Sequence, residues 1–200
     1  MDNKALYNLS YGVYLLTANE NGRDNGCIIN TAVQVANDPA RISISVIKGN
    51  LTCDMILNTG KFNLSCLDNT TTFDLIRRFG MQSGRNADKF EGLRSAFRAE
   101  NGILYLADMT NMYLSCKVVQ HLDLGSHILF IAELTDAVVM ENTPSLTYAQ
   151  YHAEVKPKPQ QSAKKQYVCS ICGYVYEGQE SPDDYLCPLC QHGKEYFELK

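Results

Sequence analysis

The segment Arg41-Ile-Ser-Ile-Ser-Val-Ile47 decides the fold, because its bulky apolar side chains recur at every second position. Ile42, Ile44 and Val46 alternate with serines, which is the period of a strand with one buried face. Runs rich in β-favouring side chains occur on both sides of this segment, at residues 12–17, 27–36, 61–67, 113–119 and 128–140. The sequence therefore predicts at least six strands.

Two segments between these runs predict short helices. Residues 51–58 follow Asn50, which favours the N-cap, and precede Gly60, which favours a helix end. Residues 70–79 repeat the pattern before Gly80. Many strands with two short helices indicate a barrel with helical insertions. The chain has no G-x-G-x-x-G motif and no regular strand–helix alternation, so a Rossmann sheet is not expected.

The composition excludes several classes of protein. The chain has 200 residues, 45% of them apolar, and a net charge of −4, which gives no general attraction to nucleic acid or anionic lipid. No apolar run reaches the ~18–20 residues of a membrane span, and the first residues lack the pattern of a signal peptide. We expect a cytoplasmic protein with no membrane or nucleic-acid partner and with reduced cysteines.

A change of composition near residue 155 predicts a domain boundary. The segment Val155-Lys-Pro-Lys-Pro-Gln-Gln-Ser-Ala-Lys-Lys165 has two prolines, four lysines and no aromatic residue, as in an extended linker. Residues 166–200 beyond it hold two lysines against six acidic residues. We therefore expect a domain at residues 1–154, a linker at 155–165 and a small acidic module at 166–200.

Four of the eight cysteines lie in this module, as Cys169-Ser-Ile-Cys172 and Cys187-Pro-Leu-Cys190. Each C-x-x-C pair can direct two sulfurs at one ion, and two pairs complete a tetrahedral site that suits zinc and iron equally. A module of this size has too small a core to fold alone, so a metal is expected. The other four cysteines are expected in the core rather than in redox chemistry: Cys27, Cys53, Cys66 and Cys116.

Residues around the cysteines point to one metal. The stretches Cys172-Gly-Tyr-Val-Tyr-Glu-Gly178 and Pro182-Asp-Asp-Tyr-Leu-Cys-Pro-Leu-Cys190, with Tyr196-Phe-Glu198, resemble short rubredoxin modules such as those at the end of rubrerythrins. This resemblance implies one iron in a four-cysteine site, with a structural zinc ribbon as the alternative. The expected small aromatic core comprises Tyr167, Tyr174, Tyr185 and Phe197.

A second set of motifs lies upstream of the linker. In order, they are Tyr11-Gly-Val-Tyr-Leu-Leu-Thr17, Asn25-Gly-Cys-Ile-Ile-Asn-Thr31, Lys48-Gly-Asn-Leu-Thr52, Phe79-Gly-Met-Gln-Ser-Gly-Arg85, Asp88-Lys-Phe90 and Gly125-Ser-His127. Their order and spacing resemble the flavin reductase family with the FMN-binding split barrel. The resemblance implies a mainly β, FMN-binding split β-barrel that forms a homodimer.

FMN needs donors for its phosphate and polar contacts along its ring. Residues 48–52 offer a cation and a helix N-terminus, which binds phosphate readily, and residues 83–89 offer further donors. Asn30 and Thr31 resemble the family segment beside the flavin ring. The predicted FMN contacts are Asn30, Thr31, Lys48, Asn50, Thr52, Ser83 and Lys89, with Arg78 and Arg85 as further candidates. Simpler roles stay open, such as a helix cap for Asn50 and a surface charge for Lys89.

His127 is the candidate catalytic residue. Many members of the flavin reductase family carry Gly-Asp-His at this place, with the histidine near flavin and nicotinamide, whereas this chain carries Gly125-Ser-His127. The alternative is a histidine that only completes the barrel rim.

Together the two resemblances indicate the flavin reductase–rubredoxin fusions called high-molecular-weight rubredoxins. They imply that NADH or NADPH reduces FMN and that single electrons then pass through iron to an acceptor such as a flavodiiron protein. Two alternatives stay open. One is a free-flavin or ferric reductase with a structural zinc ribbon, and the other is a flavoredoxin-like carrier that does not use a nicotinamide. An acidic module disfavours a third, a zinc ribbon on nucleic acid.

Overall fold

A computed structural model describes residues 2–157, 165–178 and 185–199. The chain divides into two compact units, Met1–Pro157 and Lys158–Lys200. Most of the expected linker, residues 158–164, lies outside the described residues. None of the helices in the described ranges is long and apolar enough to cross a bilayer.

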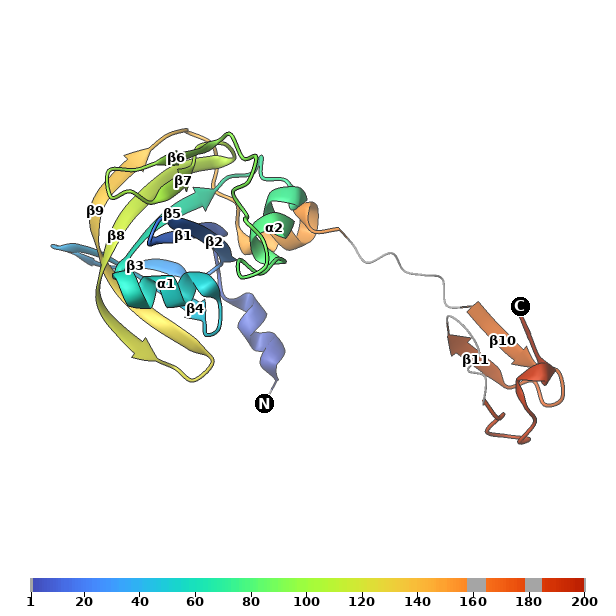
Figure 1. Cartoon of the computed structure of the whole chain (residues 1–200). Helices are drawn as coiled ribbons and strands as arrows, with labels where there is room; N and C mark the ends of the chain where they lie inside the picture. Colours follow the sequence, from blue (N-terminus) through green and yellow to red (C-terminus); the bar gives the residue numbers. More distant parts are fainter. Residues whose placement is uncertain (1, 158–164, 179–184, 200) are drawn as a thin grey trace. The chain divides into compact units, whose positions relative to one another are not determined.

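The first unit is built on one seven-stranded antiparallel sheet, in the order β2-β1-β5-β8-β9-β4-β3. The sheet curls into a barrel (Figure 1). This confirms the predicted, mainly β fold with few short helices. The strands are β1 (Tyr14–Glu20), β2 (Arg23–Ile29), β3 (Ala32–Asn37), β4 (Ala40–Ile47), β5 (Lys61–Leu67), β8 (Thr110–Asp123) and β9 (His127–Val139).

The alternation in 41–47 is confirmed by β4, in which Ile42, Ile44 and Val46 are buried. The run at 27–36, however, is not one strand. It breaks at Asn30 and Thr31 into the end of β2, which pairs with β1, and β3, which pairs with β4. The sequence hides this break because β-favouring residues continue on both sides of it.

The barrel interior holds the main hydrophobic core, with side chains from β1, β2, β4, β5, β8, β9 and α1 (Leu51–Thr59). The predicted caps of this helix are confirmed. The Asn50 side chain accepts a hydrogen bond from Thr52 N, and Gly60 ends the helix with a φ of 68°, which glycine adopts readily.

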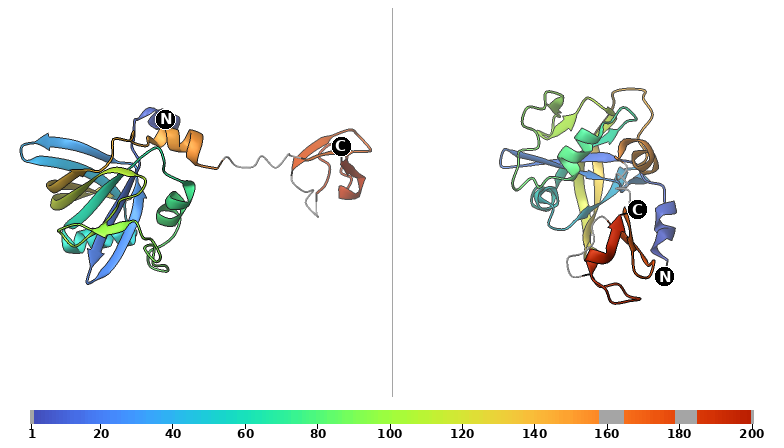
Figure 2. Two further views of the ribbon diagram at one scale, coloured as in Figure 1. Left: turned by 90° about the horizontal axis from the view of Figure 1, so that it is seen from above. Right: turned by 90° about the vertical axis from the view of Figure 1, so that its right-hand side faces the viewer.

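A second core lies on the other face of β1, where Val13 and Leu15 pack with residues of α2 (Phe73–Gly80). Tyr151 joins this core from the segment after α3 (Tyr148–Gln150), the π-helical turn η2 (Tyr151–Val155). The remaining elements of this unit are η1 (Asn3–Asn8), β6 (Ala96–Arg98) and β7 (Leu104–Leu106). Two further views show α1 and α2 against the barrel (Figure 2).

The second unit is a small three-stranded sheet, in the order β11-β10-β12. Its elements are β10 (Lys165–Cys169), β11 (Val175–Gly178), η3 (Lys194–Tyr196) and β12 (Phe197–Leu199). The ring of Phe197 lies 5.5 Å from that of Tyr185 and 6.5 Å from that of Tyr174, centroid to centroid. These contacts join three of the four expected aromatic residues, and the fourth, Tyr167, lies 6.3 Å from Tyr176, which lies 4.6 Å from Tyr185.

Candidate functional site

The second unit brings four cysteine sulfurs into one cluster, in which all four lie within 4.8 Å of one another. Sγ of Cys169 lies 3.6 Å from Sγ of Cys190, and Sγ of Cys172 lies 3.4 Å from Sγ of Cys187. A disulfide needs about 2.05 Å. Four sulfurs at about 2.3 Å from a central ion lie about 3.8 Å apart in a tetrahedron. The sulfur positions therefore fit a tetrahedral iron or zinc ion.

The first pair of cysteines sits on a tight backbone turn. Gly173 N donates to Cys169 O (2.8 Å) and Cys169 N donates to Tyr174 O (2.9 Å). Gly173 closes the turn with a φ of 75°, a conformation that glycine adopts without steric cost.

The second pair repeats this geometry with different residues. Gln191 N donates to Cys187 O (2.8 Å) and Cys187 N donates to His192 O (2.8 Å). Gln191 has a φ of 59°, a left-handed conformation that is unfavourable for a residue with a Cβ. The two turns are thus equivalent in their hydrogen bonds.

Backbone amides favour the thiolate form that a metal needs. Burial raises the pKa of the Cys187 thiol, but hydrogen bonds from the N–H groups of Cys190 and Leu189 and from the neighbouring thiols together lower the pKa to about 7. For Cys172 and Cys190, backbone hydrogen bonds also lower the pKa, but burial and the neighbouring thiols outweigh them and raise it. Cys169 and Cys187 are 0% exposed, whereas Cys172 is exposed and Cys190 partly exposed. The cluster therefore reaches the surface of its unit at the second cysteine of each pair.

In the first unit, four of the predicted residues line one cavity. Asn30, Thr31, Asn50 and His127 come from the β2–β3 break, the start of α1 and the start of β9, and they enclose about 190 Å³. Nδ1 of His127 lies 2.9 Å from Ser126 Oγ, so the serine in place of the family's aspartate orients the imidazole. Residues that are far apart in the sequence thus meet at the β2–β3 break.

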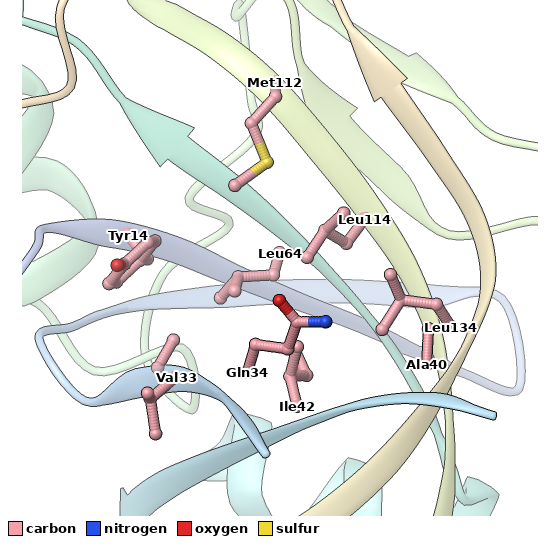
Figure 3. A pocket seen from close by; sticks show the side chains of 10 residues that line it. Tyr14, Val33, Gln34, Ala40, Ile42, Leu64, Met112, Leu114 and Leu134 are labelled. Carbon is pink, nitrogen blue, oxygen red and sulfur yellow. The ribbon is translucent and has the colours of Figure 1, made fainter. Parts of the chain in front are cut away.

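Asn30 also borders two other cavities. One of about 640 Å³ is lined by residues of five segments, among them Tyr11, Thr31 and Ser45, and one of about 290 Å³ is lined by Tyr148 and Tyr151 among others. An apolar hollow of about 300 Å³ shares Tyr14, Ala32 and Val33 with the larger cavity. Figure 3 shows its side chains converging from β1, β3, β4, β5, β8 and β9.

Cationic side chains gather beside the start of α1. Lys48 Nζ forms a 2.7 Å ion pair with Asp123, and the backbone N–H of Lys48 donates to Ser126 O, next to His127. Arg85 reaches from its own loop to Gly49 O (3.3 Å) and to an Asp54 carboxylate oxygen (2.5 Å). The loops at residues 48–52 and 83–85 therefore meet through Arg85, and Lys48 lies at the start of the first loop. This donor set, next to a cavity with polar and apolar walls, fits FMN.

Three predicted contacts have other partners. Lys89 is 3% exposed, and its Nζ donates to Gly26 O and Phe79 O (both 2.9 Å). Thr52 is 0% exposed, and its hydroxyl accepts from Asn25 Nδ2. Ser83 is exposed, and its Oγ accepts from Arg85 N. Lys89 and Thr52 are thus both buried and hydrogen-bonded to protein groups in this structure. Of the further candidates, Arg78 binds Glu91 O.

Sequence reasoning missed several residues that line the largest cavity. Ser43 and Ser45 were visible as the polar positions of the alternating segment, and both line it. Ser145 and Thr147 carried no local signal. An isolated β-bridge between Thr147 and Gly12 positions Thr147 at the cavity, and a second β-bridge between Ser145 and Asp68 positions Ser145 there. Only the tertiary fold reveals this group.

Comparison with protein families divides the chain in the same two parts. Residues 6–155 match the family described as "Flavin reductase like domain", and residues 167–198 match the "Rubrerythrin, rubredoxin-like domain". The high molecular weight rubredoxin of Moorella thermoacetica is 37% identical over 99% of both chains. The ferric-chelate reductase (NAD(P)H) of Archaeoglobus fulgidus is 34% identical, over 82% of this chain and 96% of the reductase.

Solved structures share the fold. The NADH:FAD oxidoreductase of Streptomyces globisporus C-1027 superposes with a TM-score of 0.65 at 19% identity, over 72% of this chain and 84% of its own. The FMN-binding protein of Thermus thermophilus superposes with a TM-score of 0.64 at 17% identity, over 88% and 90%.

Proposed function

Because the chain belongs to the flavin reductase-like family and carries a rubredoxin-like domain at its C-terminal end, we propose that it passes electrons from NAD(P)H through FMN to a four-cysteine iron centre, and then to an acceptor protein such as a flavodiiron protein. One observation carries the proposal: a single chain combines a flavin reductase-like barrel with four sulfurs spaced for one tetrahedral ion. The proposed domains are residues 1–154 and 166–200, joined by a linker at 155–165.

Residues at the β2–β3 break are proposed to bind FMN along its ring and ribityl chain. Asn30 and Thr31 present polar groups to the two cavities that they share. Lys48, Asn50 and Ser83 are proposed to face the phosphate, with Arg85 beside them. The exposed Lys48–Asp123 pair does not oppose this role, because exposed ion pairs contribute little stability and yield readily to a phosphate.

His127 is proposed to contact the nicotinamide. It lines the same cavity as Asn30 and Asn50, and Ser126 fixes the direction of its ring. An imidazole held this way can orient a bound carboxamide by hydrogen bonding.

The four cysteines are proposed to hold iron. Cys172 is exposed, and the residues that directly precede Cys172 and Cys190, Ile171 and Leu189, are both more than half exposed. These residues would form the contact for an electron acceptor. FMN held by the first unit would supply hydride acceptance and single-electron release, and iron held by the four cysteines would supply a one-electron couple. The covalent link keeps the two centres at an effective concentration on the order of millimolar.

The test is an anaerobic titration of the full chain, purified with its metal and flavin, using NADH and NADPH in separate samples. We expect both the flavin bands and the iron–thiolate charge-transfer bands to lose intensity. A matched sample with zinc in the four-cysteine site should lose the flavin bands alone, and it separates the two overlapping signals.

Each alternative predicts a different result. Zinc alone in natively expressed protein, with FMN released during purification, would identify a free-flavin or ferric reductase with a structural ribbon. Flavin bands that resist both nucleotides would identify a carrier that does not use a nicotinamide. We further propose a homodimer, which sedimentation of the full chain would test.

A further inference from the structure

Asn25 lies behind the two loops that are proposed to bind the FMN phosphate. It belongs to β2, is 2% exposed, and pairs with Ala18 of β1. Its side chain therefore has no access to solvent or to a ligand. What it contacts is the start of α1 on one side and the loop at residues 83–85 on the other.

The contact with α1 is a hydrogen bond. Asn25 Nδ2 donates to Thr52 Oγ1 at 2.9 Å, and Thr52 is itself 0% exposed. The N–H of Thr52 is held by Asn50 Oδ1 at 3.1 Å, so the amide of Asn25 is one step from the N-cap of the helix. A buried hydroxyl that loses its donor is costly, so this bond fixes the first turn of α1.

The contact with the second loop is a close approach. A Cβ placed on Gly84 would lie 2.0 Å from Asn25 Oδ1, which shows that the loop backbone passes directly over the amide. Arg23, two residues earlier on β2, donates to Gly84 O at 2.6 Å. Strand β2 therefore contacts both loops, through Arg23 and Asn25. The exposed Arg85 also joins the two loops, because its guanidinium donates to Gly49 O.

We propose that Asn25 is a positioning residue that sets the spacing of the two phosphate-binding loops and so determines the preference for FMN over riboflavin. This inference rests on the proposed function. Riboflavin lacks the phosphate but shares the ring and ribityl chain. Loss of the spacing should therefore weaken FMN binding and leave riboflavin binding unchanged.

The experiment measures both dissociation constants on the flavin-free full chain by quenching of flavin fluorescence. For Asn25→Ala we expect the Kd for FMN to rise about tenfold or more, which corresponds to about 1.4 kcal/mol, and the Kd for riboflavin to stay the same. Gly84→Ala should give the same result by pushing the loop off the amide, and it carries the test if Asn25→Ala does not fold.

Asn63→Ala is the matched control. Asn63 is 0% exposed and also uses its amide to hold a loop, through Ile103 O (2.9 Å) and Asn101 (2.7 Å), away from the two phosphate-binding loops. It should lower stability without changing either constant. Equal weakening of FMN and riboflavin in Asn25→Ala, or no change in either, overturns the inference. A wild-type chain that does not bind FMN overturns the proposed function as well.

Discussion

The two units are held together by different means. The first has two hydrophobic clusters, with Phe62 and Phe130 at 0% exposure among many buried side chains. In the second, Cys169 and Cys187 are the only buried residues among the side chains that the structure describes there. A hydrophobic core therefore stabilises the first unit, whereas the second depends on its ion. The difference teaches that flavin binding and metal binding can be disturbed one at a time.

Loss of the metal should have the largest effect. Cys169→Ser removes one sulfur of the cluster, and the second unit should then unfold, because metal binding supplies on the order of 10 kcal/mol of its folding free energy. Proton NMR of the full chain should show loss of the dispersed signals of this unit alone. Cys116→Ala, in the core of the first unit, is the control and should leave the metal bands intact. A second unit that stays folded without metal would contradict the comparison.

Truncation of a side chain in the barrel core should destabilise the first unit and leave the metal site of the second unit intact. Phe130 on β9 is 0% exposed, and Phe130→Ala should destabilise the first unit by about 3–5 kcal/mol. Thermal unfolding followed by flavin fluorescence would measure the loss, while the iron–thiolate bands should persist. Val139→Ala, at 82% exposure on the same strand, should change stability by less than about 0.5 kcal/mol. If Phe130→Ala lost its iron–thiolate bands at the same lowered temperature at which its first unit unfolds, the two units would not be independent.

The two units also differ in how far the sequence predicts them. In the second, C-x-x-C spacing alone predicted the cluster, because the ligands are close along the chain and the turn geometry is local. In the first, periodicity predicted β4 and the caps of α1, but not the break at Asn30 or the approach of Thr147 to the cavity. Those features depend on strand pairing over long sequence separations, which local patterns do not encode.

The same limit explains Lys89. Lys89, in the motif Asp88-Lys-Phe90, was expected to contact the phosphate. The neighbouring residues in the sequence carry no signal that its amine donates to two carbonyl oxygens, Gly26 O and Phe79 O. Burial lowers the pKa of Lys89 below its ordinary value of 10.5. Its amine is therefore part of the scaffold of the first unit.

Substitution of this lysine should give an intermediate effect. Lys89→Met leaves Gly26 O and Phe79 O without their donor, so the first unit should lose about 1.5–3 kcal/mol. In the wild type, the unfolded chain binds more protons than the folded one between the lowered folded pKa and 10.5. The contribution of Lys89 to the free energy of unfolding is therefore fully present above pH 10.5, and it is lost as the pH falls through the folded pKa of Lys89.

Urea midpoints of the first unit, measured against pH, check this. Lys89→Met should not show the rise of stability with pH between the folded pKa of Lys89 and 10.5. Lys61→Met, at an exposed position at the start of β5, should keep it. If Lys89→Met left the urea midpoint unchanged but raised the Kd for FMN, Lys89 would be a phosphate contact rather than a structural residue.

The smallest expected effect lies within the metal unit, between its two equivalent turns. Gln191 holds the left-handed conformation that Gly173 holds in the first turn, with φ values of 59° and 75°. A residue with a Cβ is strained there by about 1–2 kcal/mol, and part of that is offset by the greater freedom of glycine in the unfolded chain. Gln191→Gly should therefore stabilise the unit by about 0.5–1 kcal/mol, and Gly173→Ala should destabilise it by a similar amount. Denaturant midpoints of the iron–thiolate bands would measure both. A loss of stability in Gln191→Gly would mean that the Gln191 side chain contributes more to the turn than its backbone strain costs, and the two turns would then not be equivalent.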